Sequence, residues 1–366
     1  MKLVKYSKNL SQGMRISRGG FQKRTHWILT MKESDGIGLD ITNSCDVIAE
    51  GQCINFDFNQ IKFFLKSVYE EGRLESCTMQ ELEESCLRSE TYPSRSSSKY
   101  ALLAAASTTT QLLSLNLQVN PNTINRIAKD GYASNSYWLE DVDDMIIESK
   151  SLMDKGVQRI KHHVGVKTPQ EEAVRCLRLM HKCLEYKPTS MHAFDLNCAY
   201  SYEEANTFIG TLEESSLRDH ILWVEEPLHF NLYYRLKELQ DNTSIPLAAG
   251  ENATSVQELA ELTGSIYMTM PDLGRNCNIN DLSRLCKLSS HYRTIISPHN
   301  YGSQCLTQKT LKSFLIHKDL RYFEADLSDN PLRSDGEALS ILSIIKNTFS
   351  ESILNPSKIW ISGKID

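Results

Sequence analysis

The sequence predicts an α/β protein in which a barrel of parallel strands follows a smaller α+β module. Six short apolar runs in the last two-thirds of the chain each end at a charged or metal-binding side chain, 21 to 30 residues apart. This spacing matches one strand, one helix and two loops. Parallel strands that repeat in this way usually close into a barrel, with chemistry at their carboxyl ends. The six terminal residues are Asp195, Glu225, Glu251, Asp272, His299 and Glu324.

The first 115 residues have a different pattern, and we expect them to form a domain of their own. Residues 27–41 read as two strands joined by a turn at residues 34–36. Helical spacing follows in residues 61–72 and 78–90, the second opened by a threonine with acids in its first turn. After a polar break, residues 99–117 are strongly apolar and predict a buried helix.

The barrel is expected over residues 116–330, and residues 331–366 are expected to fold back on the amino-terminal domain. Residues 123–132 are interpreted as the first strand and residues 157–165 as the second. Helices are predicted between them, at residues 141–156, and after them, at residues 169–186, where Pro169 suits a first helical turn. The six strand-end residues then mark strands three to eight, which completes a barrel.

Composition excludes several classes of protein. The net charge is −6 with no basic block, so nothing indicates nucleic-acid binding. No apolar stretch is long enough to cross a bilayer, and the first 20 residues lack the apolar core of a secretory signal. The ten cysteines are scattered without a metal-ligand spacing, which is typical of reduced thiols in a cytoplasmic protein.

Three of the strand-end acids, Asp195, Glu225 and Glu251, stand on consecutive predicted strands. Carboxylates that converge from neighbouring strands repel one another unless a cation neutralises them. Oxygen ligands of this kind suit Mg²⁺, with water and substrate oxygens completing the coordination. The alternative is that each acid pairs with a basic residue at the barrel mouth.

Asp272 and His299 stand on the next two strands. A carboxylate beside an imidazole fixes the ring and raises its basicity, which makes His299 a candidate general base. The alternative is a packed histidine bonded to a carbonyl group.

On the second strand, Lys161 and His163 alternate and should face the same side, whereas His162 should face the helices. Lys161 could neutralise a substrate carboxylate and His163 could act in acid–base chemistry. Glu324, on the last strand, either hydrogen-bonds a developing enolate or pairs with a nearby cation.

The chain resembles the mandelate racemase subgroup of the enolase superfamily. The resemblance rests on an ordered set of motifs across residues 125–335: IKHHVG, FDLN, WVEEP, AAGEN, MPDLGR, SPHN and FEADLSDNPL. It implies a modified TIM barrel, (β/α)7β, with an α+β capping domain completed by the carboxyl-terminal tail. It also implies Mg²⁺ held by Asp195, Glu225 and Glu251, a His299–Asp272 dyad, and a substrate contact at Asn197 in FDLN.

The reaction implied by the resemblance is removal of the proton α to a carboxylate, through an ene-diolate that Mg²⁺ and Lys161 stabilise. Related muconate cycloisomerases and succinylbenzoate synthases have a lysine where this chain has Asp272, which argues against both activities. Racemases have lysine at both alternating positions of the second strand, whereas this chain has His163 at the second.

These features favour a Mg²⁺-dependent lyase that dehydrates an acid sugar to a 2-keto-3-deoxy acid, with His299 as the main acid–base residue. A racemase or epimerase of a 2-hydroxy acid, with His163 acting on the opposite face, is the first alternative. A non-catalytic barrel with a binding or structural role is the second. The expected partner is a small-molecule carboxylate, and a homo-oligomer is expected because family members are commonly oligomeric.

Overall fold

The computed structural model describes most of the barrel and parts of the amino-terminal domain. The described residues are 2–16, 19–30, 38–40, 73–86, 103–104, 107–108, 111–112, 115, 117–135, 139–301, 304–327 and 340–350.

Eight parallel strands form one curled sheet, in the order β10-β9-β8-β7-β6-β5-β4-β11. Neighbours in the sequence are neighbours in this sheet, as in a barrel built from successive βα units. The prediction of eight strands is therefore confirmed. Their bounds are β4 Tyr132–Asn135, β5 Arg159–His163, β6 Met191–Asp195, β7 Ile221–Glu225, β8 Leu247–Ala249, β9 Met268–Thr269, β10 Ile295–Ile296 and β11 Glu324–Ala325.

The two ends of this sheet, β10 and β11, meet through single hydrogen bonds. The Arg321 amide donates to the Ile296 carbonyl at 3.1 Å, and the Ser297 hydroxyl donates to the Tyr322 carbonyl at 2.8 Å. These bonds bring the last strand beside β10, so the sheet closes into a barrel.

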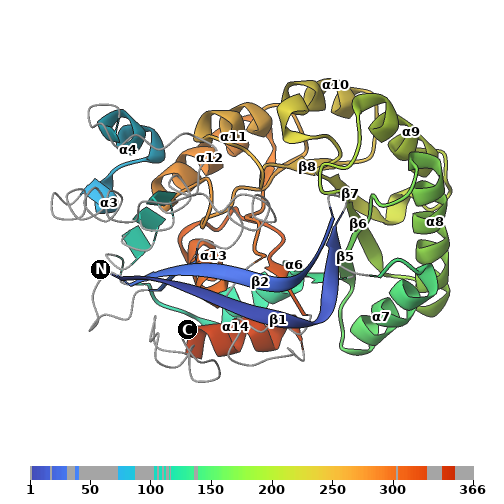
Figure 1. Cartoon of the computed structure of the whole chain (residues 1–366), viewed down its shortest axis with the longest axis horizontal. Helices are drawn as coiled ribbons and strands as arrows, with labels where there is room; N and C mark the ends of the chain where they lie inside the picture. Colours follow the sequence, from blue (N-terminus) through green and yellow to red (C-terminus); the bar gives the residue numbers. More distant parts are fainter. Residues whose placement is uncertain are drawn as a thin grey trace.

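In the described residues a helix follows each of the first seven strands and the eighth strand ends the series, which is the (β/α)7β arrangement (Figure 1). The helices predicted at residues 141–156 and 169–186 are α7 and α8. Side-chain caps begin several of them, including a Thr168–Glu171 capping box before α8. Their bounds, with two short 3-10 helices, are α7 Val142–Asp154, α8 Pro169–Tyr186, α9 Tyr202–Glu213, η1 Arg218–His220, η2 Phe230–Arg235, α10 Leu236–Asp241, α11 Val256–Thr263, α12 Ile279–Tyr292 and α13 Gln304–Ile316.

The prediction of a first strand at residues 123–132 is wrong, because most of this segment is helix α6, Pro121–Asp130. The Asn120 side chain accepts a hydrogen bond from the Thr123 amide at 2.9 Å, and Pro121 occupies the first helical position. Both are strong signals for a helix start. The strand, β4, begins only after Gly131.

Alternation along the strands separates an inner core from an outer one. Ala193 and Trp223 belong to a cluster inside the barrel, whereas Phe194 and Val224 pack outward against the helices. Side chains two residues apart share a face, so Asp195 and Glu225 continue the inner rows. The alternation therefore directs these two acids into the barrel mouth.

The amino-terminal domain contains a three-stranded antiparallel sheet of β1 Lys2–Ile16, β2 Gly19–Thr30 and β3 Gly38–Asp40. Strands β2 and β3 confirm the strand–turn–strand prediction, although the turn lies outside the described residues. In Figure 1 the long β1–β2 hairpin, in blue, runs from the amino terminus at the left toward the right of the view. Short helices α3, Arg73–Ser76, and α4, Met79–Cys86, follow.

Two other helix predictions fall in this domain. The residues described between 103 and 112 are helical and buried, as expected for the apolar segment. The helix predicted at residues 61–72 lies outside the described residues.

The described part of the carboxyl-terminal segment is helix α14, Ile341–Ser350, which packs against α6 and α13 (Figure 1). The approach is close, because a Cβ atom added to Gly131 would lie 2.9 Å from Ile341 Cγ2. The domain boundaries near residues 115 and 330 remain predictions.

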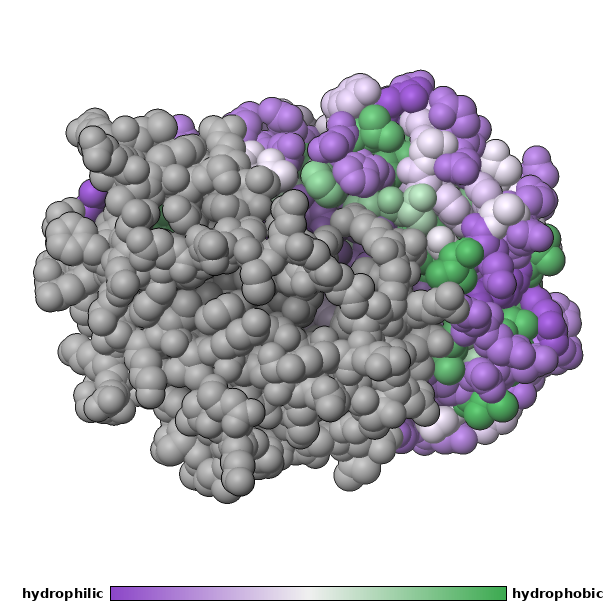
Figure 2. All heavy atoms as spheres, in the orientation of Figure 1, coloured by the Kyte–Doolittle hydropathy of each residue, from purple (hydrophilic) through white to green (hydrophobic). Residues whose placement is uncertain are grey.

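The outer faces of α7, α8 and α9 form the right-hand side of Figure 2, which is mainly hydrophilic with scattered apolar residues. Among the helices described, none is both long enough and apolar enough to cross a bilayer.

Candidate active site

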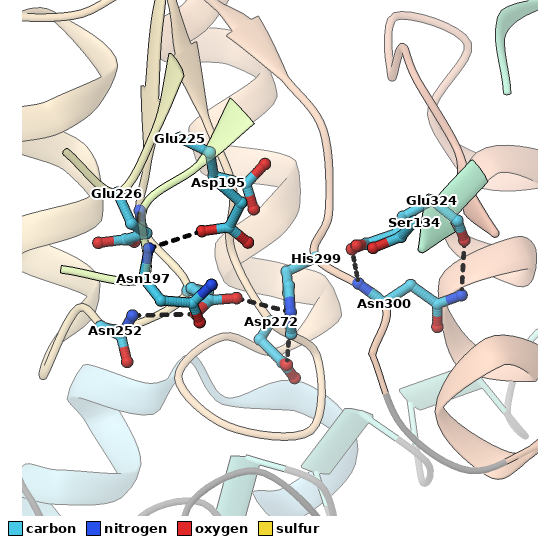
Figure 3. Close-up of polar contacts among 12 residues, drawn as sticks. Ser134, Asp195, Asn197, Glu225, Glu226, Asn252, Asp272, His299, Asn300 and Glu324 are labelled. Carbon is cyan, nitrogen blue, oxygen red and sulfur yellow. Dashed lines mark hydrogen bonds and ion pairs between the residues drawn. The ribbon is translucent and has the colours of Figure 1, made fainter. Parts of the chain in front are cut away.

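The predicted site residues lie at the carboxyl ends of the barrel strands. Asp195 and Glu225 are the last residues of β6 and β7, and Glu324 is the first residue of the short strand β11. Glu251, Asp272 and His299 follow the ends of β8, β9 and β10. Figure 3 shows the side chains of Asp195, Glu225, Asp272, His299 and Glu324 in one region.

A buried lysine lies between three of these acids. The Lys161 ammonium group is 2.6 Å from Glu225 Oε1, 2.8 Å from Glu324 Oε1 and 3.3 Å from Asp195 Oδ2. The indole of Trp223 donates to the other Glu225 oxygen at 2.9 Å. Strand β5 thus brings a cation to the ends of β6, β7 and β11.

The charges in this group fix its protonation states. Burial alone would lower the pKa of Lys161, but Glu225 and Glu324 raise it well above its ordinary value, so the amine stays protonated. Burial raises the pKa of Glu324, but Lys161 and His299 outweigh this and lower it to about 2. Lys161 therefore acts as a fixed cation, and Glu324 as its ionised partner.

His299 lies between two carboxylates. Its Nδ1 atom is 2.8 Å from Asp272 Oδ2, and its Nε2 atom is 2.6 Å from Glu251 Oε2 (Figure 3). Burial would lower the pKa of His299, but Glu251 and Glu324 raise it well above its usual value. The predicted dyad is thus in contact, with the imidazole protonated while Glu251 remains beside it.

His163 shares Asp195 with Lys161, because its Nδ1 atom lies 3.2 Å from the same Oδ2 oxygen. The Asn197 side-chain amide lies 3.1 Å from His163 Nδ1, and the Ser134 hydroxyl lies 3.3 Å from Nε2. The two residues that alternate on β5 therefore do face one side, as predicted. Asn197 contacts a site histidine, and its role toward a substrate remains a prediction.

His162 faces outward, also as predicted. Its Nε2 atom is 3.0 Å from His192 Nδ1, and its ring stacks on Phe194 in the layer between sheet and helices. The His192 Nε2 atom in turn lies 3.1 Å from the Ser190 hydroxyl. His162 is therefore part of the outer core and not of the site.

Several polar residues of the site were missed by the sequence analysis. The Asn300 amide donates to Glu324 Oε2 at 2.8 Å, and the Asn252 side chain donates to Glu251 Oε1 at 3.0 Å (Figure 3). Asn252 directly follows Glu251 in the AAGEN motif, and Asn300 directly follows His299 in the SPHN motif. These positions were the signal that could have identified them. Ser134 on β4 was missed because the first strand was misplaced.

The alternative interpretation, in which each acid pairs with a basic residue, describes the contacts only in part. Five buried acids meet here: Asp195, Glu225, Glu251, Asp272 and Glu324. Among the described residues, Lys161, His163 and His299 bring at most three positive charges into contact with these five carboxylates, and the charge of Arg275 also lowers the pKa of Glu251. Burial and the neighbouring acids raise the pKa of Glu225 well above its usual value, despite Lys161.

This excess of buried negative charge fits a hard divalent cation bound by carboxylate oxygens. Asp195, Glu225 and Glu251 are the acids on consecutive strands that could hold it. In the described part of the chain no three such side chains are already gathered as a metal site. In the structure Glu251 contacts His299, whereas Asp195 and Glu225 contact Lys161.

A comparison with protein-family models matches residues 144–342, more than half of the chain, to the model described as "Enolase C-terminal domain-like". The chain belongs to the enolase C-terminal domain-like family. The matched segment contains every predicted site residue, from Lys161 to Glu324, and confirms the family resemblance. No curated protein matched the sequence of this family member.

Solved structures of the enolase superfamily share the fold of this family member. The 3,6-anhydro-D-galactonate cycloisomerase from Zobellia galactanivorans matches with a TM-score of 0.67 at 19% identity, over 91% of this chain and 88% of that chain. The dipeptide epimerase from Cytophaga hutchinsonii, complexed with Mg and the dipeptide D-Ala-L-Val, matches with a TM-score of 0.66 at 15% identity, over 88% and 85%. A racemase from Streptomyces coelicolor with bound magnesium matches with a TM-score of 0.65 at 15% identity, over 89% and 88%.

Proposed function

We propose that this protein is a Mg²⁺-dependent enzyme that removes the proton α to a carboxylate group, and that its reaction is dehydration of an acid sugar to a 2-keto-3-deoxy acid. The observation that carries the proposal is the position of His299, fixed by Asp272 and facing a buried group of acids and one lysine. The Mg-bound structures of the epimerase and the racemase support the choice of metal.

Asp195, Glu225 and Glu251 would hold the Mg²⁺ ion. When bound, Mg²⁺ supplies Lewis-acid stabilisation of the negative charge that develops on the substrate carboxylate. The other chemistry belongs to the side chains around it.

His299 is the principal acid–base residue of the proposal. A hydrogen bond from Nδ1–H to Asp272 fixes the ring and leaves Nε2 as the reacting nitrogen. In the structure Nε2 contacts Glu251, and a Glu251 carboxylate that held the metal would leave this nitrogen free to react. The imidazole would then also lose the nearest of the negative charges that raise its pKa.

Lys161 serves as an electrostatic group and not as a base. Its amine is fully buried and remains protonated because Glu225 and Glu324 surround it. A fixed ammonium group stabilises negative charge on the substrate carboxylate and on the ene-diolate formed from it. Glu324 balances the lysine and also accepts a hydrogen bond from Asn300.

Dehydration breaks two bonds and needs two proton transfers. The C–H bond α to the carboxylate gives its proton to a base of the site, and the β C–O bond breaks as a protonated imidazole donates to the departing hydroxyl. His299 takes the α-proton at Nε2, and the imidazole that is then protonated, or that of His163, donates to the departing hydroxyl. The water and an enol leave, and the enol becomes the 2-keto-3-deoxy acid.

A racemase or epimerase is the second candidate, because His163 and His299 stand on different strands, β5 and β10, that are not neighbours in the sheet. Two acid–base groups on different sides of an α-carbon are what racemisation needs. The structural relatives named above include both an epimerase and a racemase.

The experiment is a screen of mono- and diacid sugars with Mg²⁺, in which keto acid is detected with semicarbazide. The proposal predicts keto acid from at least one sugar with the wild type and none with the His299→Asn variant. Deuterium at the α-carbon in D₂O without any keto acid would overturn dehydration in favour of racemisation. Neither product nor exchange from any acid would favour a non-catalytic barrel.

A further inference from the structure

A further buried glutamate, Glu226, lies close to Asp195 and Glu225 (Figure 3). It follows Glu225 in the chain and is fully buried. Its carboxylate accepts hydrogen bonds from the Tyr233 hydroxyl at 2.6 and 2.7 Å and from the Gly250 amide at 2.9 Å. The Cys198 thiol donates to its Oε2 oxygen at 3.2 Å. One side chain thus connects the loops that follow β6, β7 and β8.

Two of these contacts lie close in the chain to a proposed metal ligand. Cys198 lies in the loop that follows Asp195, and Gly250 is the residue before Glu251. The chain turns sharply at these points, with left-handed φ values of 59° at Cys198, 44° at Glu226 and 133° at Gly250. Non-glycine residues adopt such values only when surrounding contacts hold them there.

The peptide before Glu251 is held from both sides. The amide of Gly250 donates to Glu226, and its carbonyl accepts a hydrogen bond from the Asn276 side chain at 2.9 Å. The Asn276 side chain also accepts from the Asp272 amide at 3.0 Å. A Cβ atom on Gly250 would lie 3.1 Å from the Met270 amide, so the turn has no room for a larger residue.

We propose that Glu226 is a positioning residue, which sets the spacing of the Asp195, Glu225 and Glu251 carboxylates for Mg²⁺ by tying together the loops that carry them. This inference rests on the proposed function. Outer partners that orient metal ligands typically contribute about 10–100-fold to metal affinity. Glu226 acts through the backbone of Cys198 and Gly250 and through its own peptide.

The test is isothermal titration of the metal-free full-length protein with MgCl₂. The Tyr233→Phe variant removes the hydroxyl group that bonds Glu226 but changes no charge, whereas Glu226→Gln removes the carboxylate itself. The matched control is Glu172→Gln. Glu172 is also fully buried and accepts hydrogen bonds from the amides of residues 165–167, but it touches none of the three acids.

We expect Tyr233→Phe and Glu226→Gln to bind Mg²⁺ about 10–100-fold more weakly than the wild type. We expect Glu172→Gln to bind Mg²⁺ as the wild type does, even if its melting temperature falls. If Glu226→Gln does not fold, Cys198→Ala provides a second uncharged change at the same carboxylate.

Three results would overturn the inference. Wild-type affinity for Mg²⁺ in both Tyr233→Phe and Glu226→Gln shows that the hydrogen bonds of the Glu226 carboxylate are not needed to position the metal ligands. Weak binding in Glu226→Gln alone shows an effect of charge and not of position. Equal weakening in Glu172→Gln shows general loosening of the barrel. A wild type that binds no Mg²⁺ at all overturns the proposed function itself and removes the basis of this inference, which distinguishes the two failures.

Discussion

The ammonium group of Lys161 lies 2.6 Å from a carboxylate oxygen of Glu225, and both side chains are fully buried. Two charges removed from water are costly unless each has close partners. Lys161 has further acids on two other strands, and Glu225 has the Trp223 indole. This pair is therefore the centre of the charge arrangement at the barrel mouth, and its removal has a predictable cost.

The Lys161→Met variant should unfold more easily than the wild type. Without the lysine, three buried carboxylates lose their common cation, and breaking a buried pair in this way costs about 3–5 kcal/mol. The loss should be measured by urea unfolding in EDTA, and MgCl₂ should recover part of it. Lys182→Met is the control, because its pair with Glu185 is exposed and screened by solvent. A loss no larger than that of the control would contradict the account.

The Asp272→Asn variant should be folded but slow. An amide in place of the carboxylate no longer fixes the His299 ring with Nε2 toward the substrate, so kcat should fall by about 10²–10⁴-fold while KM changes little. The measurement is steady-state kinetics on whichever acid the keto-acid screen identifies. Asp281→Asn is the control, because Asp281 is equally buried but accepts its hydrogen bond from Met79 in α4. Equal loss of kcat in both variants would disprove the special role of Asp272.

Acidification should destabilise the protein through the outer pair His162 and His192. Burial, and the neighbouring imidazoles, lower the pKa of His162 well below its ordinary value, and burial lowers that of His192 to about 3. At pH values between the folded and the unfolded pKa, the unfolded chain therefore binds protons at these two histidines, whereas the folded chain keeps them neutral. Stability is present above the unfolded pKa of about 6.5 and is lost as the pH falls from there toward the folded pKa.

The His192→Gln variant isolates this effect. Its free energy of unfolding should depend less steeply on pH than that of the wild type, by about 1.4 kcal/mol per pH unit between about pH 6 and 4. Urea unfolding at several pH values measures the slope, with the exposed His291→Gln as the control. An unchanged slope in His192→Gln would mean that the buried pair titrates as it does in the unfolded chain.

Two glycine-to-alanine substitutions should change the free energy of unfolding in opposite directions. Gly250→Ala should destabilise the protein by about 1–3 kcal/mol, because Gly250 has a φ of 133° and close neighbours at its Cβ position. Gly210→Ala should stabilise it by about 0.5–1 kcal/mol, because Gly210 lies in helix α9 with nothing within 4 Å of an added Cβ. Thermal or urea unfolding checks both, and destabilisation by Gly210→Ala would argue against the described helix.

The barrel could be predicted from the sequence because each strand ends in the same way. An apolar run followed by Asp195 or Glu225 shows both where the strand stops and which face the acid takes, since alternation has a period of two. The prediction of a strand at residues 123–132 was wrong because it used the apolar residues of the segment and overlooked the helix start signal at Asn120 and Pro121. Helix α6 and the short strand β4 have no such repeated ending.

The site was less predictable than the barrel, because the sequence of a single segment does not show which side chains on other strands it will contact. Alternation placed Lys161 on the inner face, but nothing in the sequence indicated that it would reach Glu225 and Glu324 together. Glu226 was missed for a similar reason: beside Glu225 it reads as an outward acid, and its partners Tyr233 and Gly250 come from other loops. A second acid within a buried run was the available signal.

Proton exchange at the α-carbon tests the central claim most directly. Candidate acid sugars and 2-hydroxy acids are incubated in D₂O and followed by ¹H NMR, with the wild type, with EDTA and with the His299→Asn variant. The account predicts loss of the α-proton signal, through exchange or dehydration, in the wild type with Mg²⁺, and its persistence in both other samples. An α-proton that is lost at the same rate in EDTA or in His299→Asn, or that persists throughout the panel with the wild type, would contradict it.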